Sequence, residues 1–313
     1  MGDPAGIGLE LAARAWAERG PDTPPFIFFG DADALARAAK TIGADIAGLA
    51  VHHIPIAVHE KAGAPDTANA PATIAAIAHA VSAVRDGDAS ALVTLPIAKS
   101  VLLEAGFAFP GQTEFVAHLV EDMGWQGARG PVMMLAGPSL KVALATIHTP
   151  LAQVPAVLSR PALVSLGNVV AEALRHDFGV ANPRLALCGL NPHAGESGHI
   201  GNEELSIINP AAADLRTAGW NVVDARPADS LFHADARAAY DAIIAMYHDQ
   251  GLIPIKTLHF WDAVNVTLGL PIIRTSPDHG TGFDIAGKGV ARADSFRAAL
   301  KMAWHMAERR ARA

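Results

Sequence analysis

The strongest constraint on the fold is a regular alternation along the chain of two kinds of segment. Short apolar runs rich in Val, Ile and Leu are separated by longer segments with the apolar spacing of amphipathic helices. The short runs predict strands at 26–29, 91–95, 131–135, 141–147, 184–187, 242–247, 264–268 and 272–274. The longer segments predict helices at 33–42, 69–85, 113–122, 160–176, 203–218 and 294–310. Strands that alternate with helices are typical of an α/β fold with a mostly parallel or mixed sheet.

Three local signals refine this pattern. A Gly-Pro-Ser turn at 137–139 predicts a hairpin that joins the strands at 131–135 and 141–147. Asp33, Asn69 and Asp294 are expected helix N-caps, because their side chains can accept hydrogen bonds from the first free N–H groups of a helix. Gly2–Gly8 is a turn-rich segment of the kind that follows a strand, and the sequence shows no strand ahead of it.

Composition sets the broad class of protein. The 313 residues suggest roughly two domains, and 51% hydrophobic against 18% charged residues supplies a large core. The net charge of −7 argues against nucleic-acid binding, and no apolar run or leader pattern predicts a membrane span or a secretory signal. Cys188, the single cysteine, lies in an apolar run and is expected to be buried filler. We therefore expect a cytoplasmic protein.

Three histidines share a distinctive position. His148, His193 and His248 each follow the end of an apolar strand, and each is expected to be followed by a loop that contains Pro or Gly. In open α/β sheets the carboxyl ends of the strands form the edge where ligands bind. Three neutral imidazoles brought together there would form a metal site with positions left open for substrate. Spacing alone leaves a second reading open, in which they are three separate loop histidines.

Three further polar residues lie in or after apolar segments. Lys256 follows an apolar stretch, whereas Asn265 and Arg274 stand within apolar runs, where a polar side chain is costly unless it is satisfied. Together they can bind a phosphate or carboxylate, with the guanidinium as a bidentate fork. The alternative for Arg274 is a buried ion pair with an internal aspartate. After these residues comes the glycine-rich segment 276–289, which can approach a ligand through its backbone or be a flexible surface loop.

Seven blocks of sequence, in order, resemble the 4-hydroxythreonine-4-phosphate dehydrogenase family of pyridoxal phosphate biosynthesis. The resemblance runs nearly end to end and includes Gly2–Gly8, Gly111–Phe115, Ala145–Leu151, Gly189–Gly201, Pro227–Phe232, Met246–Gly251 and Val264–Asp284. The segment Asp278–Gly289 also resembles the adenosine-binding loop of isocitrate and isopropylmalate dehydrogenases. The resemblance implies an isopropylmalate dehydrogenase-like fold: two α/β domains with a cleft between them and a cofactor site that is not of the Rossmann type.

The resemblance also implies a set of site residues. His148, His193 and His248 would hold one divalent metal (Zn, Mg or Co) in a homodimer whose active site is shared between subunits. Gln112, Thr113, Lys256, Asn265 and Arg274 would bind the substrate, and Lys256, Asp249 and Asp229 would be catalytic. His279, Gly280, Thr281 and Asp284 would bind NAD or NADP. Gln112 stands where the family usually has His, and a glutamine donates a hydrogen bond to phosphate but carries no charge.

The expected reaction is the oxidation of 4-phosphooxy-L-threonine to 2-amino-3-oxo-4-phosphooxybutanoate, which decarboxylates to 3-amino-2-oxopropyl phosphate. One alternative is a related dehydrogenase of 4-phosphothreonate or 4-phosphoerythronate. Another is a non-catalytic metal- or phosphate-binding protein, a reading favoured by Gln112 and by the lack of a strand before Gly2. The predicted domains are a cofactor-side domain at 1–110 and 275–313 and a metal, substrate and dimerisation domain at 111–274.

Overall fold

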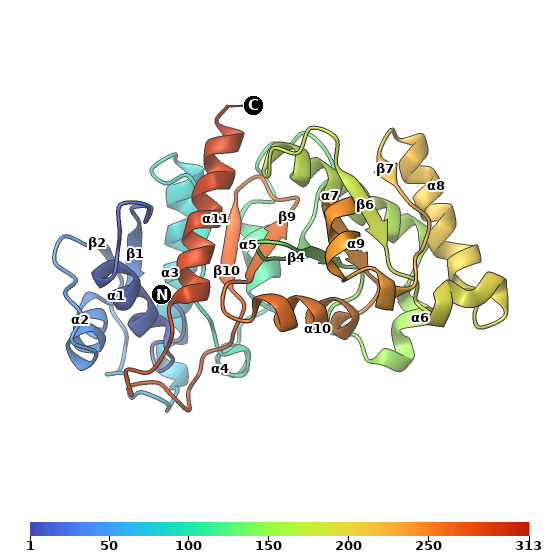
Figure 1. The fold of residues 1–313 in the computed structure, drawn as a ribbon. Helices are drawn as coiled ribbons and strands as arrows, with labels where there is room; N and C mark the ends of the chain where they lie inside the picture. The colour runs from blue at the N-terminus through green and yellow to red at the C-terminus, as the bar shows by residue number, and fades with distance from the viewer. Residues whose placement is uncertain (313) are drawn as a thin grey trace. The chain divides into compact units, whose positions relative to one another are not determined.

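The computed structural model describes residues 1–312 and divides the chain into two compact units. Unit 1 comprises residues 1–123 and 271–304, and unit 2 comprises residues 124–270 and 305–313. Each unit contains helices and strands, so the predicted α/β class is confirmed (Figure 1). The assignment of one unit to the cofactor and the other to metal and substrate stays a prediction.

Unit 1 contains two pairs of parallel strands. Strand β1 (Ile27–Gly30) pairs with β2 (Ala50–His53), and β3 (Leu92–Val93) pairs with β10 (Arg274–Pro277). The helices of this unit are α1 (Gly8–Ala17), α2 (Ala32–Thr41), α3 (Ala70–Arg85), α4 (Lys99–Glu104), α5 (Gln112–Leu119) and the first part of α11 (Asp294–Arg310). A core that includes Leu11, Phe28, Leu35 and Phe296 holds them together by burial of apolar surface.

Unit 2 is built on a mixed sheet with the strand order β9-β4-β5-β8-β6-β7. The strands are β4 (Val132–Ala136), β5 (Lys141–Leu144), β6 (Arg184–Leu187), β7 (Asn221–Val222), β8 (Ala242–Ala245) and β9 (Val264–Leu268). Strands β5, β8, β6 and β7 are mutually parallel, whereas β4 is antiparallel to β5 and β9. The predicted hairpin is therefore confirmed as β4–β5.

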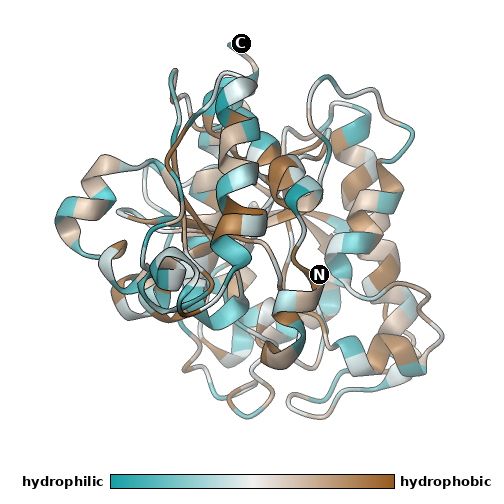
Figure 2. Ribbon diagram, turned by 90° about the vertical axis from the view of Figure 1, so that its right-hand side faces the viewer, coloured by the Kyte–Doolittle hydropathy of each residue, from teal (hydrophilic) through white to brown (hydrophobic). Residues whose placement is uncertain are grey.

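The helices of unit 2 are α6 (Val154–Val157), α7 (Arg160–His176), α8 (Asn209–Thr217), α9 (Ala234–Ala239) and α10 (His248–His259). Short helical turns cover Thr67–Asn69 in unit 1 and Leu151–Gln153, Pro192–Gly198, Glu204–Ile208 and Ala228–Ser230 in unit 2. Figure 2 shows helices that alternate between hydrophilic and hydrophobic residues around largely hydrophobic strands, the pattern on which the prediction depended. Cys188 is fully buried in the core of unit 2, as predicted.

Several local predictions are wrong. The N-cap of α2 is Asp31 rather than Asp33; Asn69 is the N-cap of α3 as predicted, but its side chain makes no capping bond. The strand expected at 272–274 is shifted to Arg274–Pro277, and the helix expected from 203 opens with a π-helical turn, Glu204–Ile208. The loop expected after His248 is helix α10, which tolerates Pro254 in its interior.

Among the described residues, no single helix is long and apolar enough to cross a bilayer. The bent pair Leu151–Val157 and Arg160–His176 has the required length and composition only when the two helices are taken together.

Candidate active site

The sheet of unit 2 brings the ends of the three histidine-bearing strands to one edge. Strand β8 lies between β5 and β6 and is parallel to both. His148 follows β5, His248 follows β8 and His193 follows β6, each within a few residues of the strand end. Because carboxyl ends of adjacent parallel strands point the same way, the three imidazoles start from neighbouring positions on the ligand-binding edge.

Two of these imidazoles lie close together. The ring centroids of His148 and His248 are 6.1 Å apart, and the rings are tilted by 38°. Nδ1 of His248 lies 2.7 Å from Oδ1 of Asp249, a contact that orients the ring and leaves Nε2 as its outward nitrogen. Among the described residues, no three or more His, Cys, Asp or Glu side chains are arranged to hold a metal ion. The chain thus pairs two of the predicted ligands but does not complete a metal site with His193.

Buried hydrogen bonds fix the strand ends that carry these rings. The Thr146 hydroxyl donates to the Met246 carbonyl at 2.8 Å and ties the end of β5 to the end of β8. Gln250 accepts from the Met246 N–H and donates to the Gly189 carbonyl, both at 2.7 Å, and so links β8 to the segment after β6. These contacts limit how far His148, His193 and His248 can move relative to one another.

His193 lies in an unusual backbone segment. His193, Ala194, Glu196 and Ser197 all have positive φ angles, between 43° and 54°, a conformation that costs a non-glycine residue about 1–2 kcal/mol. The fully buried carboxylate of Glu204 holds this segment, because it accepts from the Asn191 backbone N–H at 2.8 Å and from Asn191 Nδ2 at 3.0 Å. Strain that the surroundings maintain in this way is typical of functional loops.

Helix α10 explains how His248 and Lys256 are placed. His248 is its first residue and Lys256 stands two turns later. A Cβ on Gly251 would approach Leu144 and Val142 side-chain carbons at 2.7 and 2.8 Å, so only glycine lets α10 pack this closely on β5. On β9, the buried Oδ1 of Asn265 has no hydrogen-bond partner among the described residues. An orphaned buried acceptor of this kind favours a ligand that donates to it.

In unit 1, a polar cluster surrounds the buried guanidinium of Arg274. Nε and Nη2 donate to the Thr94 hydroxyl at 3.1 and 2.8 Å, Nη2 donates to Gln112 Oε1 at 3.0 Å, and Nη1 donates to the Thr113 hydroxyl at 3.3 Å. Burial lowers the pKa of Arg274 to about 10, which leaves it cationic at neutral pH. These contacts of its guanidinium are to hydroxyl and amide oxygens.

Three features make this cluster suitable for an anion. Gln112 and Thr113 open helix α5, whose N-terminus presents free N–H groups and the positive end of the helix dipole. The Gln112 Nε2 is buried and has no partner among the described residues. Together with the Arg274 cation, these donors match a phosphate group. Thr94, which the sequence analysis missed, holds the guanidinium. Its sequence signal is its place as a polar residue within the predicted strand 91–95.

The two glycine-rich segments of unit 1 lie side by side. The Ile7 N–H donates to the Thr281 carbonyl at 2.8 Å, and the Gly287 N–H donates to the buried carboxylate of Glu10 at 2.5 Å. A Cβ on Gly6 would lie 2.8 Å from the Thr281 carbonyl oxygen, so the approach requires glycine. His279, Gly280 and Asp284 are exposed on this loop. In unit 2, Asp229 is exposed in the turn Ala228–Ser230 that follows β7.

Comparison with known proteins identifies the class. The chain is 52% identical to a 4-hydroxythreonine-4-phosphate dehydrogenase of Maricaulis maris, over 99% of this chain and 97% of the relative. It is 51% identical to the enzyme of that name from Caulobacter vibrioides, over 99% and 96% of the two chains. In structure it is similar to the 4-hydroxythreonine-4-phosphate dehydrogenase of Klebsiella pneumoniae, with a TM-score of 0.87, 36% identity and coverage of 98% and 96%.

A more distant similarity is to a terephthalate 1,2-cis-dihydrodiol dehydrogenase from Burkholderia xenovorans, with a TM-score of 0.64, 30% identity and coverage of 97% and 96%. The fold, the site and these relatives together define an α/β dehydrogenase, an oxidoreductase. Residues 22–303 match the family described as "Pyridoxal phosphate biosynthetic protein PdxA". The chain belongs to this PdxA family, as the sequence motifs predicted.

Proposed function

We propose that this chain oxidises 4-phosphooxy-L-threonine with NAD or NADP. The secondary alcohol loses a hydride to the nicotinamide and a proton to a base, which gives 2-amino-3-oxo-4-phosphooxybutanoate. This β-keto acid then releases CO2 to form 3-amino-2-oxopropyl phosphate. The observation that carries the proposal is the Arg274–Gln112–Thr113 cluster, because buried donors around a cation match the phosphate end of this substrate.

Phosphate binding by unit 1 would contribute binding energy through a part of the substrate that is remote from the reacting carbon. Arg274 and Gln112 hold the phosphate in one orientation, and Thr94 holds Arg274, so the reacting hydroxyl is positioned by contacts that do not take part in bond breaking. Gln112 contributes a neutral donor, so Arg274 supplies the positive charge that faces the phosphate.

The residues at the strand ends of unit 2 suit a divalent metal. His148 and His248 offer two close imidazoles, Asp249 orients one of them, and we propose His193 as the third ligand. When bound, Zn, Mg or Co would favour the ionised form of the substrate hydroxyl and offset the charge that develops during decarboxylation. Lys256 is the proposed acceptor of the hydroxyl proton. Asn265 is proposed to form hydrogen bonds with the polar groups of the substrate. Asp229 is a further proposed catalytic carboxylate.

The cofactor is proposed to bind the segment Asp278–Gly289 of unit 1. Glycine-dependent packing of this segment on Gly2–Gly8 holds its backbone in one conformation, and His279, Gly280, Thr281 and Asp284 line it. A buried carboxylate oxygen of Glu10, which has no partner among the described residues, lies beneath this loop. The loop thus has the rigid backbone and the acceptors that recognition of a nucleoside needs.

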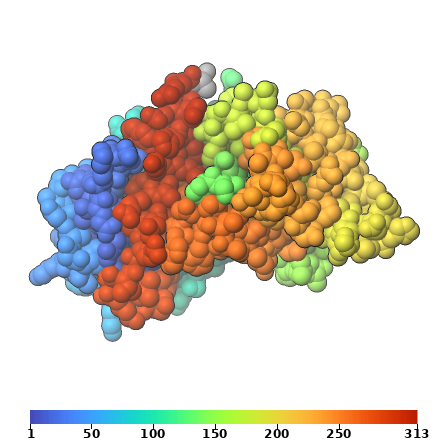
Figure 3. Space-filling view, in the orientation of Figure 1, coloured from blue at the N-terminus to red at the C-terminus, as the bar shows by residue number. Residues whose placement is uncertain are grey.

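We also propose that the enzyme acts as a homodimer in the cytoplasm. Large apolar side chains are exposed on α10 and just after it, including Ile253 at 64% and Phe260 at 63% exposure, and Leu258 and Trp261 lie in the same stretch. Figure 3 shows α10 (orange) at the surface. Exposed apolar side chains gathered in one stretch favour burial against a partner. A single buried thiol is compatible with a reducing compartment.

The decisive experiment measures NADH or NADPH formation with three phosphorylated acids: 4-phosphooxy-L-threonine, 4-phosphothreonate and 4-phosphoerythronate. We expect turnover of the first to exceed the other two. Greater turnover of a phosphorylated sugar acid would transfer the assignment to that substrate. Retained metal with no reduced nicotinamide from any of them would favour the non-catalytic reading.

A second measurement tests the metal site without relying on activity. The double variant His148→Gln/His248→Gln should lose bound metal in elemental analysis, because two of three ligands are gone. The variant His305→Gln, on the exposed side of α11, is the matched control and should keep its metal. Full metal content in the double variant would refute the assignment of these two histidines.

A further inference from the structure

Two exposed histidines from different elements of unit 1 meet at its surface. His52 lies on β2 and His79 on α3, and Nε2 of His52 is 3.1 Å from Nδ1 of His79. The ring centroids are 5.2 Å apart, and the ring planes are nearly perpendicular, at 82°. Within the part of the chain that the structure describes, this is the only polar contact of either side chain. Neither residue belongs to the phosphate, metal or cofactor sites proposed above.

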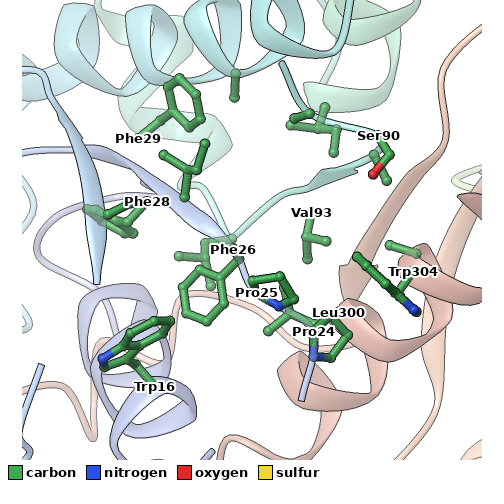
Figure 4. A pocket seen from close by; sticks show the side chains of 18 of the residues that line it. Trp16, Pro24, Pro25, Phe26, Phe28, Phe29, Ser90, Val93, Leu300 and Trp304 are labelled. Atoms are coloured by element: carbon green, nitrogen blue, oxygen red, sulfur yellow. The ribbon is translucent and has the colours of Figure 1, made fainter. Parts of the chain in front are cut away.

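Strand pairing positions the ring of His52. In the parallel pair of β1 and β2, His52 is in register with Phe29, and their rings are stacked with centroids 5.0 Å apart and planes at 26°. Phe29 packs in turn against a small core that includes Ala72 and Ala76 of α3. Figure 4 shows the Phe29 ring beside this helix, which is drawn in pale cyan. Because side chains in register on neighbouring strands share a face of the sheet, His52 lies on the face that α3 covers.

Helix α3 positions the ring of His79. Ala72, Ala76 and His79 are spaced four and three residues apart, so they lie on one face of the helix. The two alanines are buried, whereas His79 is exposed further along the same face. The packing of α3 therefore fixes where His79 emerges, next to β2. Two imidazoles that are held by packed elements lose little conformational freedom when a ligand joins them.

The separation of the two facing nitrogens suits a shared metal ion. An imidazole nitrogen lies about 2.0–2.1 Å from a bound zinc ion. Two nitrogens 3.1 Å apart then make an angle of about 95–100° at the metal, which falls between octahedral and tetrahedral geometry. In the metal-free pair one facing nitrogen donates a hydrogen bond and the other accepts it. A change of tautomer in one neutral ring therefore makes both lone pairs available to a metal, with no change in charge.

We propose that His52 and His79 bind a divalent transition-metal ion such as Zn²⁺, with the two imidazoles as protein ligands and water in the remaining positions. Imidazole suits zinc, nickel and copper ions, whereas magnesium and calcium ions prefer oxygen ligands. The bound ion joins β2 to α3 and so stabilises the packing of the helix on this sheet. With two protein ligands rather than three, this site holds its metal less tightly than the proposed strand-end site. Dialysis before elemental analysis therefore empties it.

The test measures binding of added Zn²⁺ by isothermal titration calorimetry. It uses the His148→Gln/His248→Gln protein, so that the proposed strand-end ligands do not contribute. We expect one Zn²⁺ per chain. Addition of His52→Gln or His79→Gln should weaken binding by about tenfold or more, because one imidazole of the pair is lost. His59→Gln removes another exposed histidine of unit 1 and is the matched control, which should leave the affinity unchanged.

Thermal unfolding gives a second readout, which does not depend on the double variant. Excess Zn²⁺ should raise the unfolding midpoint of the unchanged protein more than that of the single variants His52→Gln and His79→Gln. The control His59→Gln should respond to Zn²⁺ as the unchanged protein does. Without Zn²⁺ the four proteins should unfold at nearly the same temperature, because the substituted side chains are exposed.

Two results would overturn the proposal. One is an equal Zn²⁺ affinity, or an equal rise in the unfolding midpoint, with and without His79→Gln, since other surface side chains would then hold an adventitious ion only. The other is a double variant that has the circular dichroism spectrum of the unchanged protein and binds no Zn²⁺. In that case the two imidazoles would form a hydrogen bond and nothing more.

Discussion

At the scale of single residues, Arg274 shows how burial and recognition are combined. Its guanidinium is 3% exposed, and burial lowers its pKa to about 10, so the folded protein holds a cation at an electrostatic cost. Thr94, Gln112 and Thr113 offset part of this cost through hydrogen bonds. A bound phosphate would offset more, because it adds an opposite charge in a region of low dielectric.

The variant Arg274→Gln should therefore lose phosphate recognition. The loss of a charge-assisted contact of about 1.5–3 kcal/mol predicts a fall in kcat/KM of roughly 10- to 150-fold, mostly through KM. Inorganic phosphate should raise the unfolding temperature of the unchanged protein but not of the variant. Arg85→Gln, at a surface pair with Asp122, is the control and should leave KM as it is. An unaltered KM in Arg274→Gln would mean that the phosphate binds elsewhere.

At the scale of elements, the sequence located the long buried helices and some of the buried strands with their exact bounds, as for α7 and α11. Runs such as 184–187 and 264–268 were predicted with the bounds of β6 and β9, because their residues are buried and apolar. β2 was missed because three of its four residues are exposed, and β7 because it has only two residues. The cap of α2 was misplaced by two residues, since Asp31 and Asp33 are equally good caps in sequence and only the path of the chain from β1 selects one.

The Asp31 carboxylate connects helix α2 to the segment that follows β2. Its carboxylate accepts from the Ala34 N–H at 2.7 Å and the Ile56 N–H at 3.0 Å, so it caps α2 and fastens the segment after β2. Asp31→Ala should lower the free energy of unfolding by about 1–2 kcal/mol in urea titrations near neutral pH. Asp33→Ala, in the same helical turn but exposed, should cost less than half as much. Equal losses in the two variants would contradict this role of Asp31.

The same cap predicts a pH dependence. Burial alone would raise the pKa of Asp31, but the hydrogen bonds from Ala34 and Ile56 and the charges of His53 and Arg37 hold it below its usual 3.8. A carboxyl whose pKa is lower in the folded state stabilises the fold above its unfolded pKa, and this contribution is lost as the pH falls through the folded value. The stability gap between the unchanged protein and Asp31→Ala should thus narrow below about pH 4. A gap that widens toward acid would contradict the pKa argument.

At the scale of the whole molecule, the exposed apolar side chains on and just after α10 are the feature that favours the proposed dimer. The exposed apolar residues lie on and just after α10, the helix that begins with His248. A partner that covers them would therefore lie against an element of the proposed metal site. The strand-end position of the histidines was predictable from sequence, whereas this surface was not, because the segment was expected to be a loop.

Phe260→Glu should weaken the dimer, because a charge placed in an apolar interface must lose its water without a partner. Light scattering should then show a larger fraction of monomer, and specific activity should fall in proportion if the active site is shared between subunits. Leu103→Glu introduces the same charge at an exposed leucine of α4 and should leave the assembly unchanged. A monomeric unchanged protein with full activity would contradict the proposal.

The sequence by itself determined the α/β class, most strand positions and the family, and it supplied the candidate site residues. These follow from local patterns: buried strands must be apolar, and motifs keep their residues in order. Only the tertiary structure decided which of those residues meet. It placed β8 between β5 and β6, put Arg274 against Thr94 and the start of α5, and brought His52 of β2 beside His79 of α3. Strand order and such pairs depend on contacts between distant segments, and no local pattern in one chain encodes them.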